Sequence, residues 1–312
     1  MFLYPWDIHP VRLKSAITYF GLNPRQTWEA SRSDISIRGL MDEVQQAVAA
    51  IVPSKTLEIL LLGTTNGDPT LGISHTIFEI VPKGKYRLFY AVHVQAKSEW
   101  ILDLVLTWYE RRQPDAAYQF YKQTKCAATT ASLAGVIWKR QVYRYFRSIR
   151  NSQSISLVSL QDKTIHRWDY PGGAEMVQFR VPGLTDALQT AVKKQEACYL
   201  QALNFKAVDS LVYQPGGLSC IQITDAMTQP IQVGGLQVIQ KCITLEDAGL
   251  ASLRPLYNGN GRLWPFIFVV PEDSKFSRVP QKLEGGTKIW RQKIHQFLLA
   301  LPETKVWCVA SS

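Results

Sequence analysis

The sequence predicts an α/β protein in two parts: a mainly helical N-terminal domain, residues 1–125, and a mixed-sheet C-terminal domain, residues 126–312, with helices on both sides of its sheet. Two observations predict this division. Apolar residues recur at helical spacing through most of the first part, whereas short alternating or continuous apolar runs, typical of strands, dominate the second part. A run of small and polar residues, Cys126–Ser132, separates the two parts and is predicted to be a linker.

In the N-terminal domain, helical spacing of apolar residues predicts four helices: Leu13–Phe20, Ile37–Ile51, Glu99–Arg111 and Asp115–Tyr121. Between the second and third of these, Ser74–Val81 and Tyr86–Val94 are predicted to be strands.

A helix over Ser132–Arg150 is the best-defined element of the C-terminal domain. Its apolar side chains form one stripe: Trp138, Val142, Tyr145, Phe146 and Ile149. Arg140, Arg144 and Arg147 project from nearly the opposite face, with Tyr143 beside them. Three arginines one turn apart can contact successive phosphates of a nucleic acid. The same pattern also fits an ordinary solvated helix face, and the sequence does not distinguish the two interpretations.

The remaining elements of this domain are predicted in chain order. Strands are predicted over Ile155–Leu160 and Met176–Val181, and a hairpin joins Ala207–Tyr213 to Leu218–Thr224 through the turn motif Gln214-Pro-Gly-Gly. A helix over Leu236–Ile243, a central buried strand over Pro265–Val270 and an amphipathic helix over Lys288–Leu301 follow.

Composition limits the class of protein. The chain of 312 residues is 46% hydrophobic and 19% charged, which is typical of globular rather than disordered proteins. No apolar run approaches the roughly 18 residues of a membrane helix, and the N-terminus lacks the pattern of a secretory signal. The five scattered cysteines predict free thiols in a reducing compartment, so we expect an intracellular protein, nuclear or cytoplasmic.

The net charge of +10 is unevenly distributed. Residues 126–312 hold 21 Lys and Arg against 13 Asp and Glu, a balance of +8, whereas residues 1–125 hold 14 against 12, a balance of +2. A basic domain is expected where the partner is a polyanion such as DNA, although a basic surface can also serve solubility alone.

The common catalytic motifs are absent: there is no phosphate-binding loop, no dinucleotide fingerprint, no nucleophile elbow and no zinc-protease motif. One constellation remains. Asp209 lies in the first hairpin strand, and Gln222 and Thr224 share one face of the second, because strand side chains alternate. An acid on one hairpin strand and a polar-x-polar pair on the next is the layout of the restriction-endonuclease-like nucleases, where such residues hold Mg²⁺ and orient water. Alternatively, these are ordinary polar residues of a hairpin.

Six stretches of the chain together resemble the Crinkler and retrotransposon-hot-spot class of eukaryotic proteins, particularly its fungal members. In order they are Phe20–Arg25, Ser74–Ile80, Gly135–Val142, Asn204–Asp209, Ile221–Thr224 and Arg262–Pro271. That class joins an NTPase module to a restriction-endonuclease-like domain. The resemblance implies that residues 126–312 have this nuclease fold, and that residues 1–125 are the end of an NTPase module without its nucleotide-binding core.

Carried over position by position, the resemblance implies that Asp209 is the metal-binding acid and Gln222 the second metal ligand. Two positions depart from the pattern. Lys139 stands on the helix where members of the class often have Glu, and Thr224 stands where active nucleases of this fold have Lys. With one acid left, Mg²⁺ has too few negative ligands to bind well.

Two functions follow as hypotheses. The first is a nucleic-acid-binding protein with a degenerate nuclease fold, which, if active, is a Mg²⁺-dependent DNA endonuclease with Asp209, Gln222 and Thr224 at its site. The second is a non-catalytic, effector-type module that binds another protein. The resemblance to a class with effector members also leaves open secretion without a visible signal.

Overall fold

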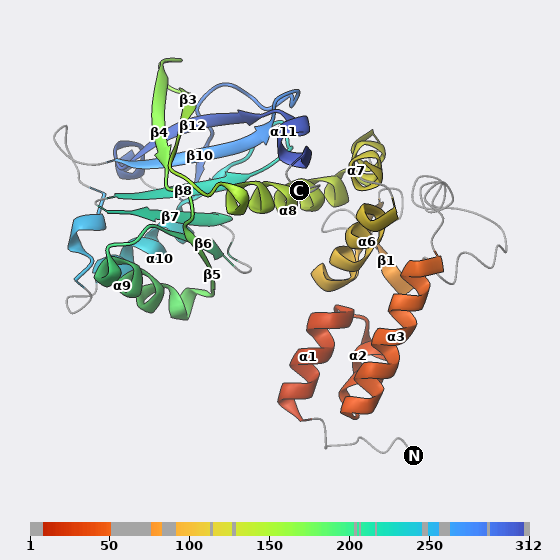
Figure 1. The fold of residues 1–312 in the computed structure, drawn as a ribbon. Helices are drawn as coiled ribbons and strands as arrows, with labels where there is room; N and C mark the ends of the chain where they lie inside the picture. The colour runs from red at the N-terminus through yellow and green to blue at the C-terminus, as the bar shows by residue number, and fades with distance from the viewer. Residues whose placement is uncertain are drawn as a thin grey trace. The chain divides into compact units, whose positions relative to one another are not determined.

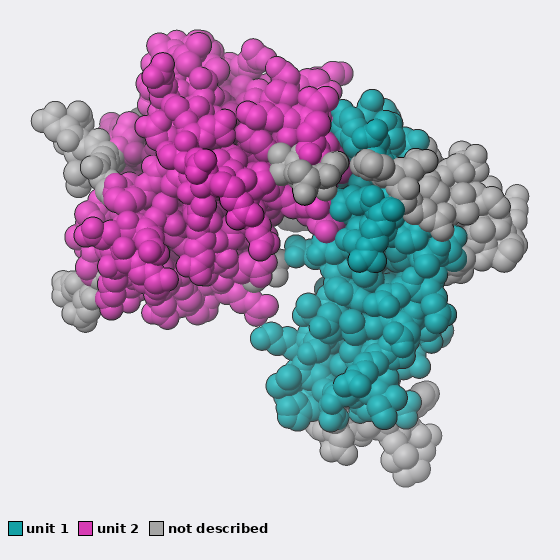
Figure 2. Space-filling view, viewed as in Figure 1, with its two compact units in different colours: residues 1–137, 311 teal, residues 138–310, 312 magenta. Residues whose placement is uncertain are grey.

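The computed structural model describes residues 9–50, 76–82, 92–112, 115–126, 129–202, 205, 207–215, 217–244, 249–255, 263–285 and 288–308. Parts of the predicted elements Ile37–Ile51, Ser74–Val81 and Tyr86–Val94 lie outside these residues. The chain forms two compact units, residues 1–137 and 138–310 (Figure 2). The boundary lies within one helix, α8 (Ala131–Ser148), whereas the sequence suggested the preceding linker.

The first unit is mainly helical, as expected. Its helices are α1 (Pro10–Phe20), α2 (Pro24–Ser31), α3 (Asp34–Ala50), α6 (Glu99–Arg112), α7 (Ala116–Cys126) and the start of α8. Its strands β1 (Phe78–Pro82) and β2 (Val92–Ala96) pair antiparallel. The short helix α2 was not predicted; it begins at the N-cap Asn23, whose side-chain oxygen accepts a hydrogen bond from the backbone N–H of Gln26 at 3.2 Å.

The second unit is built on a mixed sheet of eight strands in the order β4-β3-β12-β10-β8-β7-β6-β5 (Figure 1). The bounds of these strands are β3 (Gln153–Ser159), β4 (Ile165–Tyr170), β5 (Glu175–Phe179), β6 (Cys198–Ala202), β7 (Ser210–Gln214), β8 (Gly217–Ile223), β10 (Trp264–Pro271) and β12 (Ile294–Leu301). Strands β6, β7 and β8 form an antiparallel meander, and β8, β10 and β12 run parallel to one another. A mixed α/β architecture is therefore confirmed.

The predicted hairpin is confirmed, although its first strand begins at Ser210 rather than at Ala207. Strands β7 and β8 pair antiparallel and meet at Gln214 and Gly217, as the turn motif predicts. The predicted central strand is also confirmed, because β10 lies between β8 and β12 and is buried along almost its whole length.

The helix predicted over Lys288–Leu301 is wrong. A 3₁₀ turn over Lys288–Gln292 leads into β12, which pairs parallel with β10 along eight residues. The run Ile294–Leu301 is almost continuously apolar, and such a run fits a strand buried on both faces as well as a buried helix. The segment forms a strand because it pairs with β10 on one side and with β3 on the other.

Helices cover both faces of this sheet, as the sequence predicted. On one face α9 (Leu184–Lys194) and α10 (Val233–Thr244) lie together (Figure 1) and share a core with alternate residues of the strands, among them Leu211, Cys220 and Phe266. On the other face α8 packs against β4 and β6: Phe146 contacts Tyr170 and Tyr199, with ring centroids 5.0 and 5.8 Å apart. The helix α9 was not predicted.

The other described elements are short. They are the strand pair β9 (Ile231–Gln232) and β11 (Leu283–Glu284), the 3₁₀ turns Val181–Gly183 and Ala251–Leu253, and the helix α11 (Glu303–Cys308). Within the part of the chain that the structure describes, no helix is long and apolar enough to cross a membrane.

Candidate functional site

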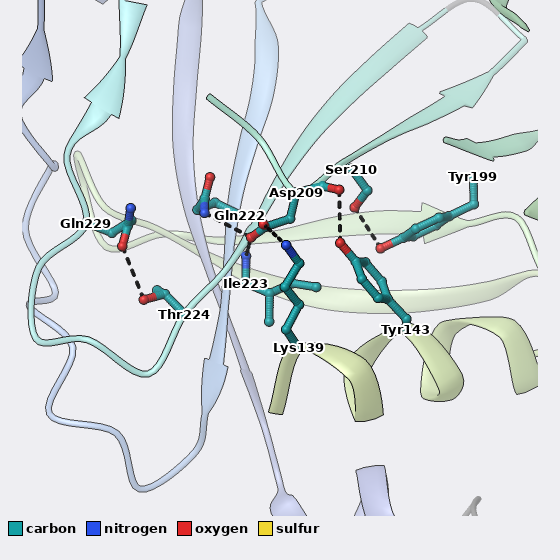
Figure 3. A network of polar contacts seen from close by, with 9 residues as sticks. All are labelled: Lys139, Tyr143, Tyr199, Asp209, Ser210, Gln222, Ile223, Thr224 and Gln229. Carbon is teal, nitrogen blue, oxygen red and sulfur yellow. Dashed lines mark hydrogen bonds and ion pairs between the residues drawn. The ribbon is translucent and has the colours of Figure 1, made fainter. Parts of the chain in front are cut away.

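Two of the functional residues suggested by the sequence, Asp209 and Gln222, meet at one end of the β7–β8 hairpin, beside α8 (Figure 3). Asp209 directly precedes β7, and Gln222 lies near the end of β8. From α8 come Lys139 and Tyr143, one helical turn apart and therefore on one face of that helix. The site thus combines two adjacent strands with the helix that covers them.

Close packing on the opposite side of the sheet holds the backbone segment that precedes Asp209. Gly235 of α10 lies against Ala207, and a Cβ atom at Gly235 would come within 2.1 Å of the Ala207 Cβ. Only glycine permits this approach of helix to chain. The segment that leads to Asp209 is therefore held by α10 from one side and by α8 from the other.

The backbone of Asp209 is bound by both neighbouring strands. Its N–H donates to the carbonyl of Ile221 at 2.8 Å, and its carbonyl accepts from the N–H of Ala202 at 2.9 Å. The same carbonyl also accepts from the hydroxyl of Tyr143 at 3.0 Å. Backbone hydrogen bonds alone therefore hold Asp209 in place, independently of the interactions of its carboxylate.

The carboxylate of Asp209 is buried and accepts from three donors. The backbone N–H of Ile223 and the side-chain amide of Gln222 donate to Oδ2, at 2.7 and 2.9 Å. The ammonium of Lys139 lies 2.5 Å from Oδ1. The side chains of Asp209 and Lys139 are 10% and 35% exposed, so the ion pair lies at the margin of the interior. A carboxylate that interacts with three donors in this way stabilises the fold around it.

Aromatic residues close the inner side of this site. The Lys139 ammonium lies 5.8 Å from the centre of the Tyr143 ring, a distance at which a cation is attracted to the ring face. Tyr143 in turn packs edge-on against Tyr199 of β6, with centroids 6.1 Å apart. The hydroxyl of Tyr199 accepts a hydrogen bond from Ser210 at 2.7 Å. Complete burial raises the pKa of Tyr199 well above its ordinary value, although the Ser210 hydrogen bond opposes this, so the phenol stays neutral.

Thr224 does not join this network. It follows the last residue of β8, and its hydroxyl accepts from the N–H of Ala226 at 3.1 Å and donates to Gln229 at 3.4 Å (Figure 3). Asp209 and Gln222 are thus brought together as the layout implied, but Thr224 faces the loop that follows the strand.

The three arginines of α8 have different environments. Arg147 is exposed, whereas Arg140 and Arg144 are half-buried and interact with other residues of the chain. Tyr143, expected beside them, is buried and turned toward Asp209. The helix is covered on more sides than its apolar stripe suggested, because Leu133, Ala134 and Gln141 are buried as well.

The residues as placed do not fit a divalent metal ion. Mg²⁺ is held by carboxylates and other oxygens in near-octahedral geometry, but among the described residues drawn in Figure 3 Asp209 is the one carboxylate, and its Oδ1 faces an ammonium. Gln222 presents its N–H rather than its oxygen to that carboxylate. Among the described residues, no group of three or more His, Cys, Asp or Glu could hold a metal ion.

Sequence reasoning identified Asp209 and Gln222 but missed the role of Lys139, which it treated only as the loss of a carboxylate. The sequence did contain a signal for this ion pair: Lys139 occupies the helix position where members of the resembling class often have Glu near the site of Asp209. Tyr199 and Ser210 carried no signal, because their pairing depends on the register of β6 and β7.

Comparison of the chain with protein-family models, curated proteins and solved structures gave no match, so the resemblance to the Crinkler and retrotransposon-hot-spot class is supported only by the stretches quoted above.

Proposed function

We propose that this chain is a nucleic-acid-binding protein with a restriction-endonuclease-like second unit whose site does not cleave. The observation that carries the proposal is the ion pair between Lys139 and Asp209. In the nuclease layout a divalent cation binds the acid of the first hairpin strand. Here the ammonium of Lys139 takes the place of that cation and neutralises the acid.

The arrangement around Asp209 supports the nuclease-like part of the proposal. The resemblance associates position 139, about 70 residues away along the chain, with the site of Asp209, and Lys139 does lie beside its carboxylate. Gln222 contacts the same carboxylate from the adjacent strand. Three positions quoted from separate stretches thus meet at one point.

The absence of cleavage follows from charge. Binding a divalent ion at Asp209 requires displacement of an ammonium at contact distance, and the ion would then have one carboxylate ligand. Without a metal ion or a lysine at position 224, the site lacks both the electrostatic stabilisation and the water-orienting group of that chemistry.

Nucleic-acid binding is supported by the charge of the second unit. The basic excess of residues 126–312, +8, belongs entirely to residues 138–312, because positions 126–137 contain no charged residue. A compact domain with this excess attracts a polyanion, and the attraction weakens as salt screens it.

The test is a paired measurement of binding and cleavage. Purified protein is titrated into fluorescent duplex and single-stranded DNA in Mg²⁺, Mn²⁺ or EDTA, and the same mixtures are run on denaturing gels. We expect salt-sensitive binding that does not require a divalent metal ion, with intact DNA. Metal-dependent cleavage that disappears in Asp209→Ala would show an active nuclease instead, and absence of binding at low salt would refute the proposal.

A second candidate, a module that binds another protein, is favoured by one observation in the first unit. Several large apolar side chains on α1 to α3 and the turns between them are exposed, among them Val11 at 63%, Leu22 at 79% and Ile35 at 82%. Exposed apolar groups of this size are common at protein interfaces. Capture of a protein partner that survives nuclease treatment and is lost on Leu22→Ser with Ile35→Ser would favour this candidate.

A further inference from the structure

The loop between β10 and β11 is an exposed basic segment of the second unit. Its residues Ser274–Lys282, here called the 274–282 loop, contain three basic residues and no acid. The three, Lys275, Arg278 and Lys282, are all exposed. The acids nearest in sequence, Glu272, Asp273 and Glu284, flank the loop, and Glu284 accepts a hydrogen bond from Gln232.

Two buried side chains anchor this loop to the unit. Phe276 is 5% exposed and packs against Phe268 of β10, with ring centroids 5.1 Å apart. Gln281 is 6% exposed and lies over β12, where its backbone N–H donates to Gln296 at 2.7 Å and its carbonyl accepts from Gln296 at 3.1 Å. The exposed basic residues lie beside or between these anchors, so their backbone is held in place before any ligand binds.

The loop is also bonded to the segment that follows β8. The N–H of Ser277 donates to the carbonyl of Met227 at 2.7 Å, and Gln281 accepts from the N–H of Gln229 at 3.0 Å. Both partners belong to the segment that follows β8. These bonds connect the 274–282 loop to the end of the strand that carries Gln222.

A fourth cation reaches the loop from the β3–β4 turn. Lys163 has a left-handed backbone, φ 67°, a conformation that is unfavourable for a residue with a side chain. In this conformation its ammonium donates to the carbonyls of Leu160, at 2.9 Å, and Arg278. The turn thus places a charge beside Arg278 and braces the loop at the same time.

Apolar side chains are interleaved with these charges. Met227 is 65% exposed and Val279 is 56% exposed, and both belong to the bonded segments described above. Positive charge mixed with exposed apolar groups on a pre-formed backbone suits a nucleic acid, whose phosphates and sugars or bases offer both kinds of contact.

We propose that the 274–282 loop, with Lys163, is the surface that contacts the phosphate backbone of nucleic acid. This inference rests on the proposed function and locates its binding surface. It replaces the arginines of α8 in that role, because two of those three are half-buried and already interact within the chain. Lys139 is also unsuited, since its charge is neutralised by Asp209.

Two double charge reversals in the full-length chain test the proposal. The loop variant is Lys275→Glu with Arg278→Glu, and the matched control is Lys193→Glu with Lys241→Glu, at exposed positions of α9 and α10. Each variant lowers the net charge by four, from +10 to +6. Lys163 is left unchanged because its ammonium braces the loop, and thermal unfolding verifies that both variants fold.

Affinity for a fluorescent duplex and a single strand is measured by anisotropy between about 50 and 200 mM salt. We expect the loop variant to bind at least ~10-fold more weakly at low salt and to reduce the slope of log affinity against log salt by about 2, since each lost phosphate contact removes about one unit. The control is expected to change affinity by less than ~3-fold.

The outcomes separate this inference from the proposed function. Equal losses in both variants, or no loss in the loop variant while wild type binds, overturn the loop surface and leave nucleic-acid binding intact. No binding by wild type overturns both. Binding of wild type to vesicles of anionic lipid but not to nucleic acid also overturns the inference, because the basic loop would then serve a different partner.

Discussion

The Lys139–Asp209 site and the 274–282 loop use positive charge in opposite ways. At the site, the ammonium is partly buried, lies 2.5 Å from a carboxylate and is backed by the Tyr143 ring. In the loop, three cationic side chains are exposed, the segment contains no acid, and the bonds that hold it are made by its backbone, by Phe276 and by Gln281.

The difference separates a charge that holds the fold together from a charge that is available to a partner. Partly buried pairs such as Lys139 and Asp209 are costly to break, because removal of one partner leaves the charge of the other uncompensated. Exposed charges such as Lys275 cost almost nothing to remove but act on a polyanion at a distance. Stability and affinity measurements should therefore respond to opposite sets of mutations.

The largest effect on stability is expected for Asp209→Ala. The change leaves the Lys139 ammonium and the N–H groups of Ile223 and Gln222 without their common acceptor. We expect the free energy of unfolding to fall by about 2–4 kcal/mol, measured as a shift of the midpoint in guanidinium chloride at unchanged slope.

Asp169→Ala, at an exposed position of β4, is the matched control and is expected to change stability by less than about 0.5 kcal/mol. If the two substitutions cost the same, the carboxylate of Asp209 is not an anchor, and the contrast between site and loop disappears.

A smaller, pH-dependent effect is expected at the β3–β4 side of the second unit, which also carries Lys163. His295 of β12 bonds to Ser159 at 2.9 Å, and its ring centroid lies 5.6 Å from that of His166. Burial and the neighbouring His166 lower the pKa of His295, with Asp162 in partial opposition. The unfolded chain therefore binds more protons below about pH 6.5, so stability falls as the pH decreases through this range.

The measurement is the unfolding midpoint at several pH values between about 5 and 7.5, where carboxylates stay ionised. His295→Gln should flatten the dependence while leaving DNA affinity at pH 7.5 unchanged. A pH dependence that is the same in wild type and variant would place its origin at another group.

The smallest effect on stability is expected for Lys275→Ala. The side chain is exposed, so we expect a change within about 0.5 kcal/mol. The same substitution should weaken DNA binding severalfold at low salt. A clear loss of stability would show that the charge of Lys275 is used within the fold, as that of Lys139 is.

Elements that are defined by residues close together in the sequence were predicted, whereas elements that depend on contacts between distant residues were not. The β7–β8 hairpin was predicted because its turn motif and alternation are local. The strand β12 was predicted as a helix because Ile294–Leu301 is apolar on both faces, and only pairing with β10 and β3 defines it as a strand. Such pairing joins residues far apart in sequence and leaves no local trace.

The same distinction applies to the candidate site. Asp209 and Gln222 could be predicted to meet, because one hairpin carries both. Their contact with Lys139 required the packing of α8 on the sheet, for which only the resemblance gave a hint. The 274–282 loop was not identified at all, since three basic residues near one proline look like any loop until Phe276 and Gln281 are seen to anchor it.

The central claim, that Lys139 takes the place of a metal ion at Asp209, is tested most directly by titrating Mn²⁺ into wild type and Lys139→Glu in a calorimeter. The account predicts no binding to wild type at millimolar Mn²⁺, and one saturable site in folded Lys139→Glu that Asp209→Asn removes. Saturable binding of Mn²⁺ to wild type that Asp209→Asn abolishes would contradict it.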